Sequence, residues 1–251
     1  MRVSRRAALA AVLAALALPA AASAKPLKVA LLVPGHANDG SFNQVAAEAI
    51  KSLAAEGAVT FELRESMADP SKSEPIIRQY AASGYDLIIG HGIELSEPIL
   101  KIAASFPKAH FAASGGPDLA GRLLPNVDGW TYDFGQQGYL SGFVAGKLKG
   151  VATFGMVGGP ELGFVKASHT GFKAGLMEGN PSAKVIESYT GSFDDAQKAA
   201  EATRGMIAQG AKVVWTSGDG IGNGVVAAAA QDDAFATLAA YPAPAKARAA
   251  F

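Results

Sequence analysis

The sequence predicts an α/β protein made of two lobes, each built around a parallel sheet. Short apolar runs alternate with amphipathic helical patterns along most of the chain, which is typical of parallel sheets covered by helices. The alternation falls into two comparable runs, at residues 27–125 and 126–231. Hydrophobic residues make up 49% of the 251 residues and charged residues 18%, a composition that supports a buried core and not a disordered chain.

The first run predicts four strands and three helices. The strands are expected at residues 27–33, 59–63, 86–89 and 110–114, and the helices at 41–56, 73–82 and 97–104. The first strand is apolar on both faces and ends at Pro34 and Gly35, as expected of a strand inside a parallel sheet. Ser41 and Gln44 have the spacing of a capping box at the start of the first helix.

The second run repeats this order. It predicts a short extended piece at 129–132, strands at 152–157, 185–189 and 213–216, and helices at 138–148, 164–177, 194–209 and 222–230. Asp194 and Gln197 have a second capping-box spacing. In sheets of this kind a ligand binds at the carboxyl ends of the strands, so we expect a cleft between the two lobes.

The N-terminus resembles a secretory leader. A basic segment at residues 1–6 precedes an apolar run at 7–18, Pro19 breaks the run, and the small residues 22–24 fit a signal-peptidase site. The run is too short to cross a bilayer, and the alternative is a buried N-terminal helix. We therefore expect residues 1–24 to be removed after Ala24 and the remainder to be a periplasmic protein.

Charge and cysteine content exclude several classes of function. The 22 basic residues balance the 22 acidic residues, and loss of the leader leaves a slight acidic excess. Such a chain lacks the basic surface of a nucleic-acid-binding protein, so no nucleic acid partner is expected. With no cysteine, the chain has no disulfide, no thiolate metal site, no cysteine nucleophile and no N-terminal cysteine for lipidation.

No catalytic or metal-binding motif is complete. The four histidines have neither metal-ligand spacing nor a HExxH context, so no metal is expected. Residues 138–142 have the wrong spacing for a nucleophile elbow, and residues 142–147 are one residue short of a P-loop. Residues 218–224 form either a loose phosphate cradle or a tight strand-to-helix turn. No cofactor is expected.

The candidate ligand-binding residues follow the predicted strands. Asp39, Phe42 and Asn43 lie after the first strand, where a carboxylate could accept hydrogen bonds and a ring could stack on a ligand. His91, between two glycines, follows the third strand, and Phe193 precedes a helix in the second run. Alternatives remain open: Asp39 and Ser41 cap a helix while Phe42 is core, the His91 segment is a plain turn, and Phe193 is a hydrophobic staple.

Several segments together resemble the basic-membrane-protein family of periplasmic substrate-binding proteins of ABC transporters. Ser41-Phe42-Asn43-Gln44 is similar to that family's S-F-N-Q after the first strand, and 139–146 to its Y-L-x-G-x-x-A-G helix. Further similar segments are 86–92, 106–111, 157–159, 171–175, 191–195, 207–211 and the turn at 220–224. The resemblance covers residues 28–231.

The resemblance implies a fold and a ligand class. It implies two Rossmann-like lobes of the type I periplasmic-binding-protein kind, which close about a hinge. It implies a purine nucleoside or related base as ligand, clamped between Phe42 and Phe193, with polar contacts from Asp39, Asn43 and Gly220. It also implies an inner-membrane ABC permease as the partner.

The sequence departs from the family pattern in two places. Residues 132–136 replace a more acidic stretch, and residues 232–251 are rich in alanine and proline where family members continue with a strand, an aspartate and a lysine. We expect 232–251 to be an atypical tail without an apolar strand, to follow a frameshift or truncation, and to leave the sheet of the first lobe (25–125) incomplete. A natural short tail is the alternative.

Two other functions are compatible with these residues. One is an exported α/β enzyme acting on a small polar substrate, with His91 or Asp39 as the base. The other is a non-functional remnant of a binding protein. The solute-binding function is the interpretation that we favour.

Overall fold

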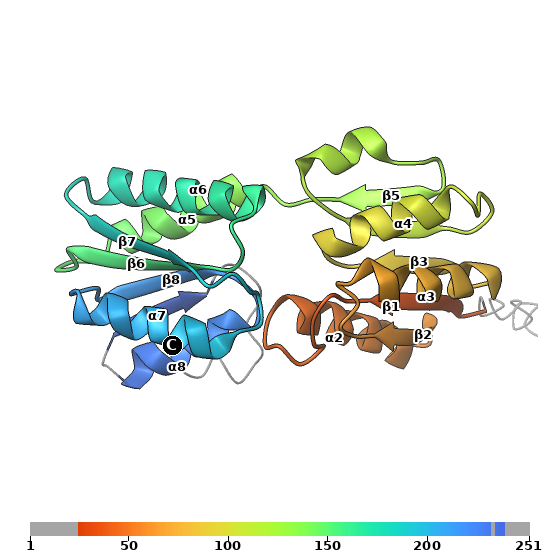
Figure 1. Cartoon of the computed structure of the whole chain (residues 1–251), viewed down its shortest axis with the longest axis horizontal. Coiled ribbons are helices and arrows are strands. Elements are labelled where there is room, and N and C mark those ends of the chain that lie inside the picture. Colours follow the sequence, from red (N-terminus) through yellow and green to blue (C-terminus); the bar gives the residue numbers. More distant parts are fainter. Residues whose placement is uncertain (1–24, 232–233, 239–251) are drawn as a thin grey trace, which may run out of the picture.

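A computed structural model describes residues 25–231 and 234–238, and these form two parallel sheets (Figure 1). The first sheet has five strands in the order β2-β1-β3-β4-β5, and the second has four in the order β7-β6-β8-β9. All strand pairs are parallel. The predicted α/β class with two parallel-sheet lobes is confirmed.

The first lobe contains the strands β1 (Leu27–Leu32), β2 (Val59–Arg64), β3 (Leu87–Gly90), β4 (Phe111–Ser114) and β5 (Val127–Trp130). Its helices are α2 (Phe42–Ala55), α3 (Pro70–Ala82), α4 (Ser96–Ala103) and the 3-10 helices η1 (Ile93–Leu95) and η2 (Pro117–Arg122). Alternate residues of β1 enter different cores: Val29 and Leu31 pack with Ile50 of α2, and Ala30 and Leu32 with the α3–α4 side. The sheet is thus buried on both faces.

The strand β5 lies in the first lobe, which corrects the boundary expected at residues 125 and 126. Phe111 pairs with Val127 and Ser114 with Trp130. The sequence pattern places residues 129–132 as a short extended piece but carries no information about its neighbour in space. Val127 is only 5% exposed, and its burial against β4 ties the segment to the first sheet.

The second lobe contains β6 (Thr153–Gly158), β7 (Lys184–Tyr189), β8 (Val213–Ser217) and β9 (Phe235–Leu238). Its helices are α5 (Phe134–Gly146), α6 (Gly163–Gly179), α7 (Ala196–Ala208) and α8 (Ile221–Gln231). Phe154, Met156 and Trp215 pack with the α6 residue Phe172, whereas Val214 packs on the opposite side with α7 and α8.

The expectation that residues after 231 lack a strand is wrong for 235–238. This segment forms β9, which pairs with β8 from Val213 opposite Phe235 to Thr216 opposite Leu238. Four residues are too few for alternation of apolar side chains to stand out in an alanine-rich segment. The helix α8 is therefore followed by a strand of its own sheet. The rest of the expected tail lies outside the described residues.

Helix starts differ from the predicted capping boxes. Asp39 replaces Ser41 as the cap of α2, because its carboxylate accepts hydrogen bonds from the backbone N–H groups of Ser41, Asn43 and Gln44 at 2.8–3.1 Å. The cap of α7 is Asp195 rather than Asp194, and its side chain accepts from the N–H of Lys198. The Asp194 side chain therefore does not cap α7.

Glycines allow α5 and α6 to pack backbone against backbone. A Cβ added at Gly138 or Gly142 of α5 would overlap the carbonyl groups of Ser168 or Phe172 in α6. A Cβ at Gly171 or Gly175 of α6 would likewise overlap carbonyl groups of α5. This close approach fixes the two helices relative to each other, and both helices carry pocket residues.

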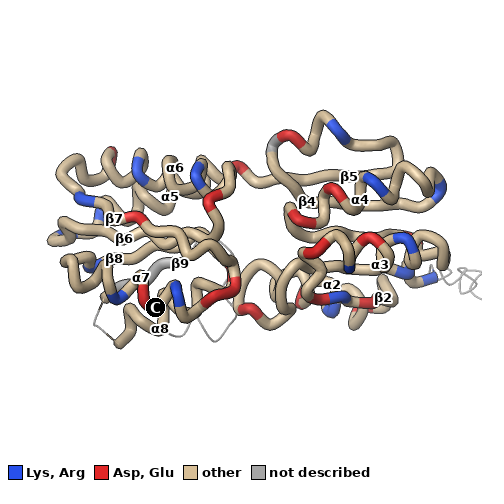
Figure 2. The backbone as a smooth tube through the Cα atoms, viewed as in Figure 1, with Lys and Arg blue, Asp and Glu red and all other residues tan. Residues whose placement is uncertain are grey.

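Lys and Arg residues are distributed over both lobes, as are Asp and Glu residues (Figure 2). Within residues 25–231 and 234–238, no helix has the length and apolar character needed to cross a lipid bilayer.

Candidate ligand-binding site

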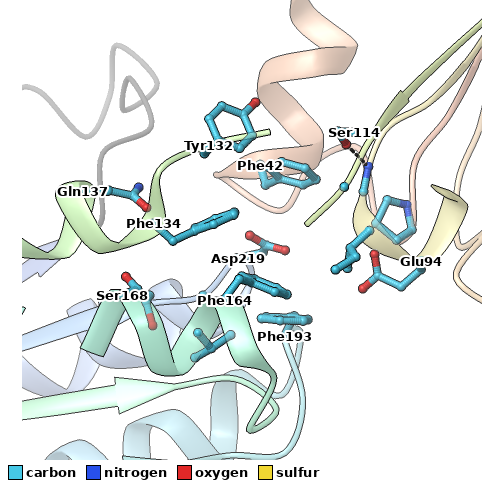
Figure 3. Close-up of a pocket in the computed structure, with 17 residues that line it drawn as sticks. Phe42, Glu94, Ser114, Tyr132, Phe134, Gln137, Phe164, Ser168, Phe193 and Asp219 are labelled. Carbon is cyan, nitrogen blue, oxygen red and sulfur yellow. Dashed lines mark hydrogen bonds between the residues drawn. The ribbon is translucent and has the colours of Figure 1, made fainter. Parts of the chain in front are cut away.

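A pocket is lined by residues from both lobes (Figure 3). Most of its lining follows the carboxyl ends of β1, β3, β4, β7 and β8 or lies in the first turns of α2, α5 and α6. This is the position at which α/β sheets bind ligands.

Aromatic rings dominate the pocket wall. Phe42 comes from the first lobe, and Phe134, Phe164 and Phe193 come from the second (Figure 3). The rings of Phe164 and Phe193 are stacked, with centroids 6.2 Å apart and an interplanar angle of 19°. The ring centroids of Phe134 and Phe164 are 4.8 Å apart, and the two rings are tilted relative to each other. Tyr132, in the segment that joins the lobes, contacts Phe134 edge-on at 5.8 Å.

His91 supports Phe42 from behind. The two rings are stacked with centroids 3.8 Å apart, and His91 Nε2 donates to the Phe42 carbonyl oxygen at 3.2 Å. Burial lowers the pKa of His91, although the Phe42 carbonyl and Asp39 act in the opposite direction. A neutral imidazole therefore packs against Phe42. His91 does not line the pocket itself.

Asp39, Asn43 and Gly220 also lie outside the pocket lining. The Asp39 carboxylate is occupied by the start of α2 and by Asn43, whose Nδ2 donates to it at 2.8 Å. Gly220 lies one residue before α8 and accepts from the N–H of Asn223. Of the six residues singled out from the sequence, the structure brings Phe42 and Phe193 to the pocket, and the other four are not part of its lining.

Two carboxyl groups face the pocket from opposite lobes, Glu94 from η1 and Asp219 from the turn after β8 (Figure 3). Burial raises the pKa of Asp219 well above its ordinary value, and the carboxylates of Asp39, Glu94 and Asp194 raise it further. Burial also raises the pKa of Glu94, with a contribution from Asp194. The pocket thus concentrates acidic groups, and no Lys, Arg or His contributes to its lining in the described part of the chain.

Hydroxyl and amide groups complete the lining. The Ser114 hydroxyl oxygen accepts a hydrogen bond from the Gly92 N–H at 2.6 Å. Ser168 Oγ is buried and has no hydrogen-bond partner among the described residues. Ser217 Oγ lies 2.9 Å from His169 Nε2, and Gln137 adds a side-chain amide. These groups can fix the orientation of a ligand that the rings hold.

The sequence interpretation missed most of the second lobe's contribution. Phe134 is the first residue of α5 and Phe164 the second residue of α6. An aromatic residue in the first turn of a helix that follows a strand is the signal that singled out Phe42, and it also identifies Phe164. Asp219 lies in the segment 218–224, which was interpreted as a turn or a phosphate cradle with a ligand contact expected at Gly220, and Ser217 directly precedes that segment.

Comparison with known proteins identifies the family. The family described as "ABC transporter substrate-binding protein PnrA-like", abbreviated Bmp, matches residues 27–236. The chain belongs to the Bmp family. This confirms the resemblance found in the sequence. The Bmp family consists of substrate-binding proteins and not of enzymes, which overturns the exported-enzyme alternative.

Solved and curated relatives agree with this assignment. A solute-binding protein of an ABC transporter system from Conexibacter woesei is 51% identical with a TM-score of 0.74, covering 89% of this chain and 73% of that chain. A solute-binding protein from Aeropyrum pernix shares the fold with a TM-score of 0.71 at 24% identity, covering 85% of this chain and 61% of that chain. The "CD4+ T-cell-stimulating antigen" of Listeria innocua is 29% identical over 82% of this chain and 58% of its own. "Basic membrane protein A" of Borreliella afzelii is 26% identical over 74% of this chain and 57% of its own. The chain thus spans less than two thirds of the length of these curated relatives.

No group of three or more His, Cys, Asp or Glu side chains within the described ranges could hold a metal ion. The pocket chemistry consists of aromatic faces, carboxyl groups and hydroxyl groups.

Proposed function

We propose that this Bmp-family chain is the solute-binding component of an ABC importer and captures a purine nucleoside or a related base in the pocket. The observation that carries the proposal is the position of Phe42 and Phe193. Both rings line the same pocket, and they come from different lobes. A flat ring between two such rings gains stacking energy, which is about 1–3 kcal/mol per base in nucleic-acid-binding proteins.

The polar lining supports a neutral ring with hydrogen-bond donors. Asp219 and Glu94 provide carboxyl groups, and the hydroxyl oxygen of Ser217 and the amide of Gln137 add further acceptors. The amino groups and ring N–H of purine bases, and the hydroxyl groups of ribose, are suitable donors. A phosphate group would find no Lys, Arg or His in the described lining to balance its charge, so we expect nucleosides and bases to bind better than nucleotides.

The proposed partner and location follow from the family. Solute-binding components deliver their ligand to a membrane permease, and the relative from Conexibacter woesei is itself described as a solute-binding protein of an ABC transporter system. We propose delivery to an inner-membrane permease from the periplasm. The leader that would direct export, residues 1–24, lies outside the described residues.

A thermal melt with and without a panel of purine bases, nucleosides and nucleotides tests the ligand class. A ligand that binds the native state raises the melting temperature by mass action. We expect a nucleoside or base to raise it and the matching nucleotide to have little effect. A folded protein that no purine stabilises at millimolar concentration would overturn the assigned ligand class, and a protein without a cooperative melt would favour the remnant alternative.

A further inference from the structure

Three hydrogen-bonded side chains lead from the pocket wall, through the buried His169, to Glu187 on the edge strand β7 of the second lobe. Ser217, the last residue of β8, lines the pocket, and its Oγ lies 2.9 Å from Nε2 of His169 in α6. The other ring nitrogen, His169 Nδ1, lies 2.8 Å from Glu187 Oε1 in β7. His169 is only 1% exposed, and its ring stacks on that of Tyr189 at 4.9 Å.

The charge on Glu187 determines where the proton of His169 lies. Burial alone would raise the pKa of the Glu187 carboxyl, but hydrogen bonds from Lys173, His169 and Tyr189 outweigh it and lower the pKa to about 2. Lys173 Nζ donates to Oε2 at 2.8 Å, and the Tyr189 hydroxyl donates to Oε1 at 2.9 Å. An ionised carboxylate only accepts hydrogen bonds, so His169 Nδ1 carries a proton.

The state of His169 then determines the role of Ser217. Burial lowers the pKa of His169 and outweighs the opposing effect of Glu187, while the charge of Lys173 lowers it further. A neutral imidazole with its proton on Nδ1 has a lone pair on Nε2. The Ser217 hydroxyl must donate to this lone pair. The hydroxyl proton of Ser217 is therefore engaged in the hydrogen bond to His169. Only the lone pairs of the Ser217 oxygen remain to bind a ligand.

We propose that Ser217 is a specificity-determining hydrogen-bond acceptor of the pocket, held in this role by His169 and Glu187 as positioning residues. The proposal rests on the proposed function, because it assumes that a ring ligand occupies the pocket. It adds that the ligand presents an N–H or O–H donor to Ser217. A carbonyl or phosphate oxygen at that point would face the oxygen lone pairs and lose affinity.

Binding of ligand pairs that differ by one donor tests the acceptor role. The pairs are adenosine and purine riboside, guanosine and inosine, and adenosine and its 2′-deoxy and 3′-deoxy forms. For one pair, we expect loss of the donor to weaken binding to the wild-type chain by about 3- to 10-fold. In Ser217→Ala, loss of the same ligand donor should weaken binding by less than about 2-fold, because the serine oxygen that accepts from this donor is absent.

Two control variants distinguish this effect from general damage. Ser217→Thr retains the hydroxyl and should retain the discrimination. Thr216→Val removes the neighbouring hydroxyl, which is buried without a partner in the described structure and does not line the pocket, and it should also retain the discrimination. Discrimination ratios that are the same in the wild type and Ser217→Ala for every pair would overturn the proposal.

Nitrogen-15 NMR of the histidine side chains tests the positioning role without any ligand. At neutral pH we expect His169 as the neutral Nδ1–H tautomer and a change of tautomer population in Glu187→Ala. A protonated Nε2 would overturn the proposal, since Ser217 would then accept from His169 and donate to the ligand. If no member of the panel binds, the ligand class of the proposed function fails, and the NMR result still decides the role of Ser217.

The same order of serine, histidine and carboxylate occurs in hydrolytic triads, in which the serine is a nucleophile. Release of p-nitrophenolate from p-nitrophenyl acetate measures that activity directly. Turnover by the wild type that is lost in Ser217→Ala would overturn the acceptor role. We expect no turnover above the rate of Ser217→Ala.

Discussion

The side-chain amide of Asn223 donates a hydrogen bond to the backbone carbonyl oxygen of Asp39, with a distance of 2.8 Å between Nδ2 and O. The two residues are 184 positions apart and belong to different lobes: Asn223 lies in α8, and Asp39 lies in the loop before α2. Because Asp39 also caps α2, this bond connects the second lobe to the helix turn that carries Phe42. The arrangement of the rings therefore depends on a polar contact outside the pocket.

Removal of this contact should weaken ligand binding. In Asn223→Ala we expect a loss of about 0.5–1.5 kcal/mol, the typical net contribution of one hydrogen bond, shared between folding stability and ligand affinity. Thermal melts and calorimetry measure the two parts. Gln197→Ala, which removes an exposed hydrogen bond within α7, is the control and should leave affinity unchanged. An affinity equal to that of the wild type would show that the bond does not position Phe42.

His91 should contribute to binding through Phe42 and not through catalysis. His91→Ala removes a ring that stacks on Phe42 at 3.8 Å, so we expect Phe42 to be less well ordered and ligand affinity to fall by about 3- to 10-fold. Calorimetric titration measures the change. The exposed His110→Ala is the control. An unchanged affinity in His91→Ala would contradict the supporting role.

The contact between α5 and α6 should tolerate no side chain. Gly142→Ala places a methyl group where it overlaps the Phe172 carbonyl, so the helices must separate. We expect a destabilisation of about 1–3 kcal/mol or more, as is typical of overpacking. Gly205→Ala in α7 is the matched control, since nothing lies within 4 Å of its added Cβ. It should increase stability by about 0.4–1 kcal/mol. Urea unfolding measures both, and equal midpoints would contradict the packing account.

Asp219, which is partly buried in the pocket wall, should make folding stability depend on pH. A carboxyl whose pKa is raised in the folded state stabilises the fold below its unfolded-state pKa, and this stability is lost as pH rises to the folded-state pKa. The groups that raise the pKa of Asp219 besides burial are Asp39, Glu94 and Asp194. Asp219→Asn should therefore be more stable than the wild type above about pH 4, with a difference that grows with pH and then levels off.

Melting temperatures between pH 4 and pH 8 test this expectation. Asp128→Asn, which changes an exposed carboxyl in β5, is the control and should follow the wild-type profile. A constant difference between Asp219→Asn and the wild type across this range would show that Asp219 does not titrate with folding. Removal of the Asp219 carboxyl from the pocket is also expected to weaken binding of a ligand that carries a hydrogen-bond donor. Residues that serve binding often lower the stability of the fold, so the variant should gain stability and lose affinity.

Periodicity alone predicted most of the fold. Strands buried on both faces, such as β1 and β8, produce apolar runs that no solvent-facing element would have. The positions of β5 and β9 could not be predicted in this way, because four-residue strands at a sheet edge carry little pattern and their pairing depends on distant segments. The choice between Asp39 and Ser41 as the cap of α2 also depended on backbone geometry that spacing does not specify.

The pocket could be predicted in part, because strand ends in a parallel sheet converge by topology. This argument led to Phe42 and Phe193. It could not show that Asp39 and Asn43 bond to each other and lie outside the lining of this pocket, or that Ser217 and His169, 48 residues apart, share a hydrogen bond. Such contacts depend on how α6 and the second sheet pack together, which the linear order of residues does not contain.

Calorimetric titration of the wild type, Phe42→Ala and Phe193→Ala with the purine nucleoside that stabilises the protein most tests the central claim most directly. Loss of one stacking ring should cost about 1–3 kcal/mol, so we expect each variant to bind about 5- to 150-fold more weakly. Phe143→Ala, which removes a ring of α5 outside the pocket, should bind as the wild type does. Wild-type affinity in both Phe42→Ala and Phe193→Ala would contradict the account that the two lobes hold a planar ligand between these rings.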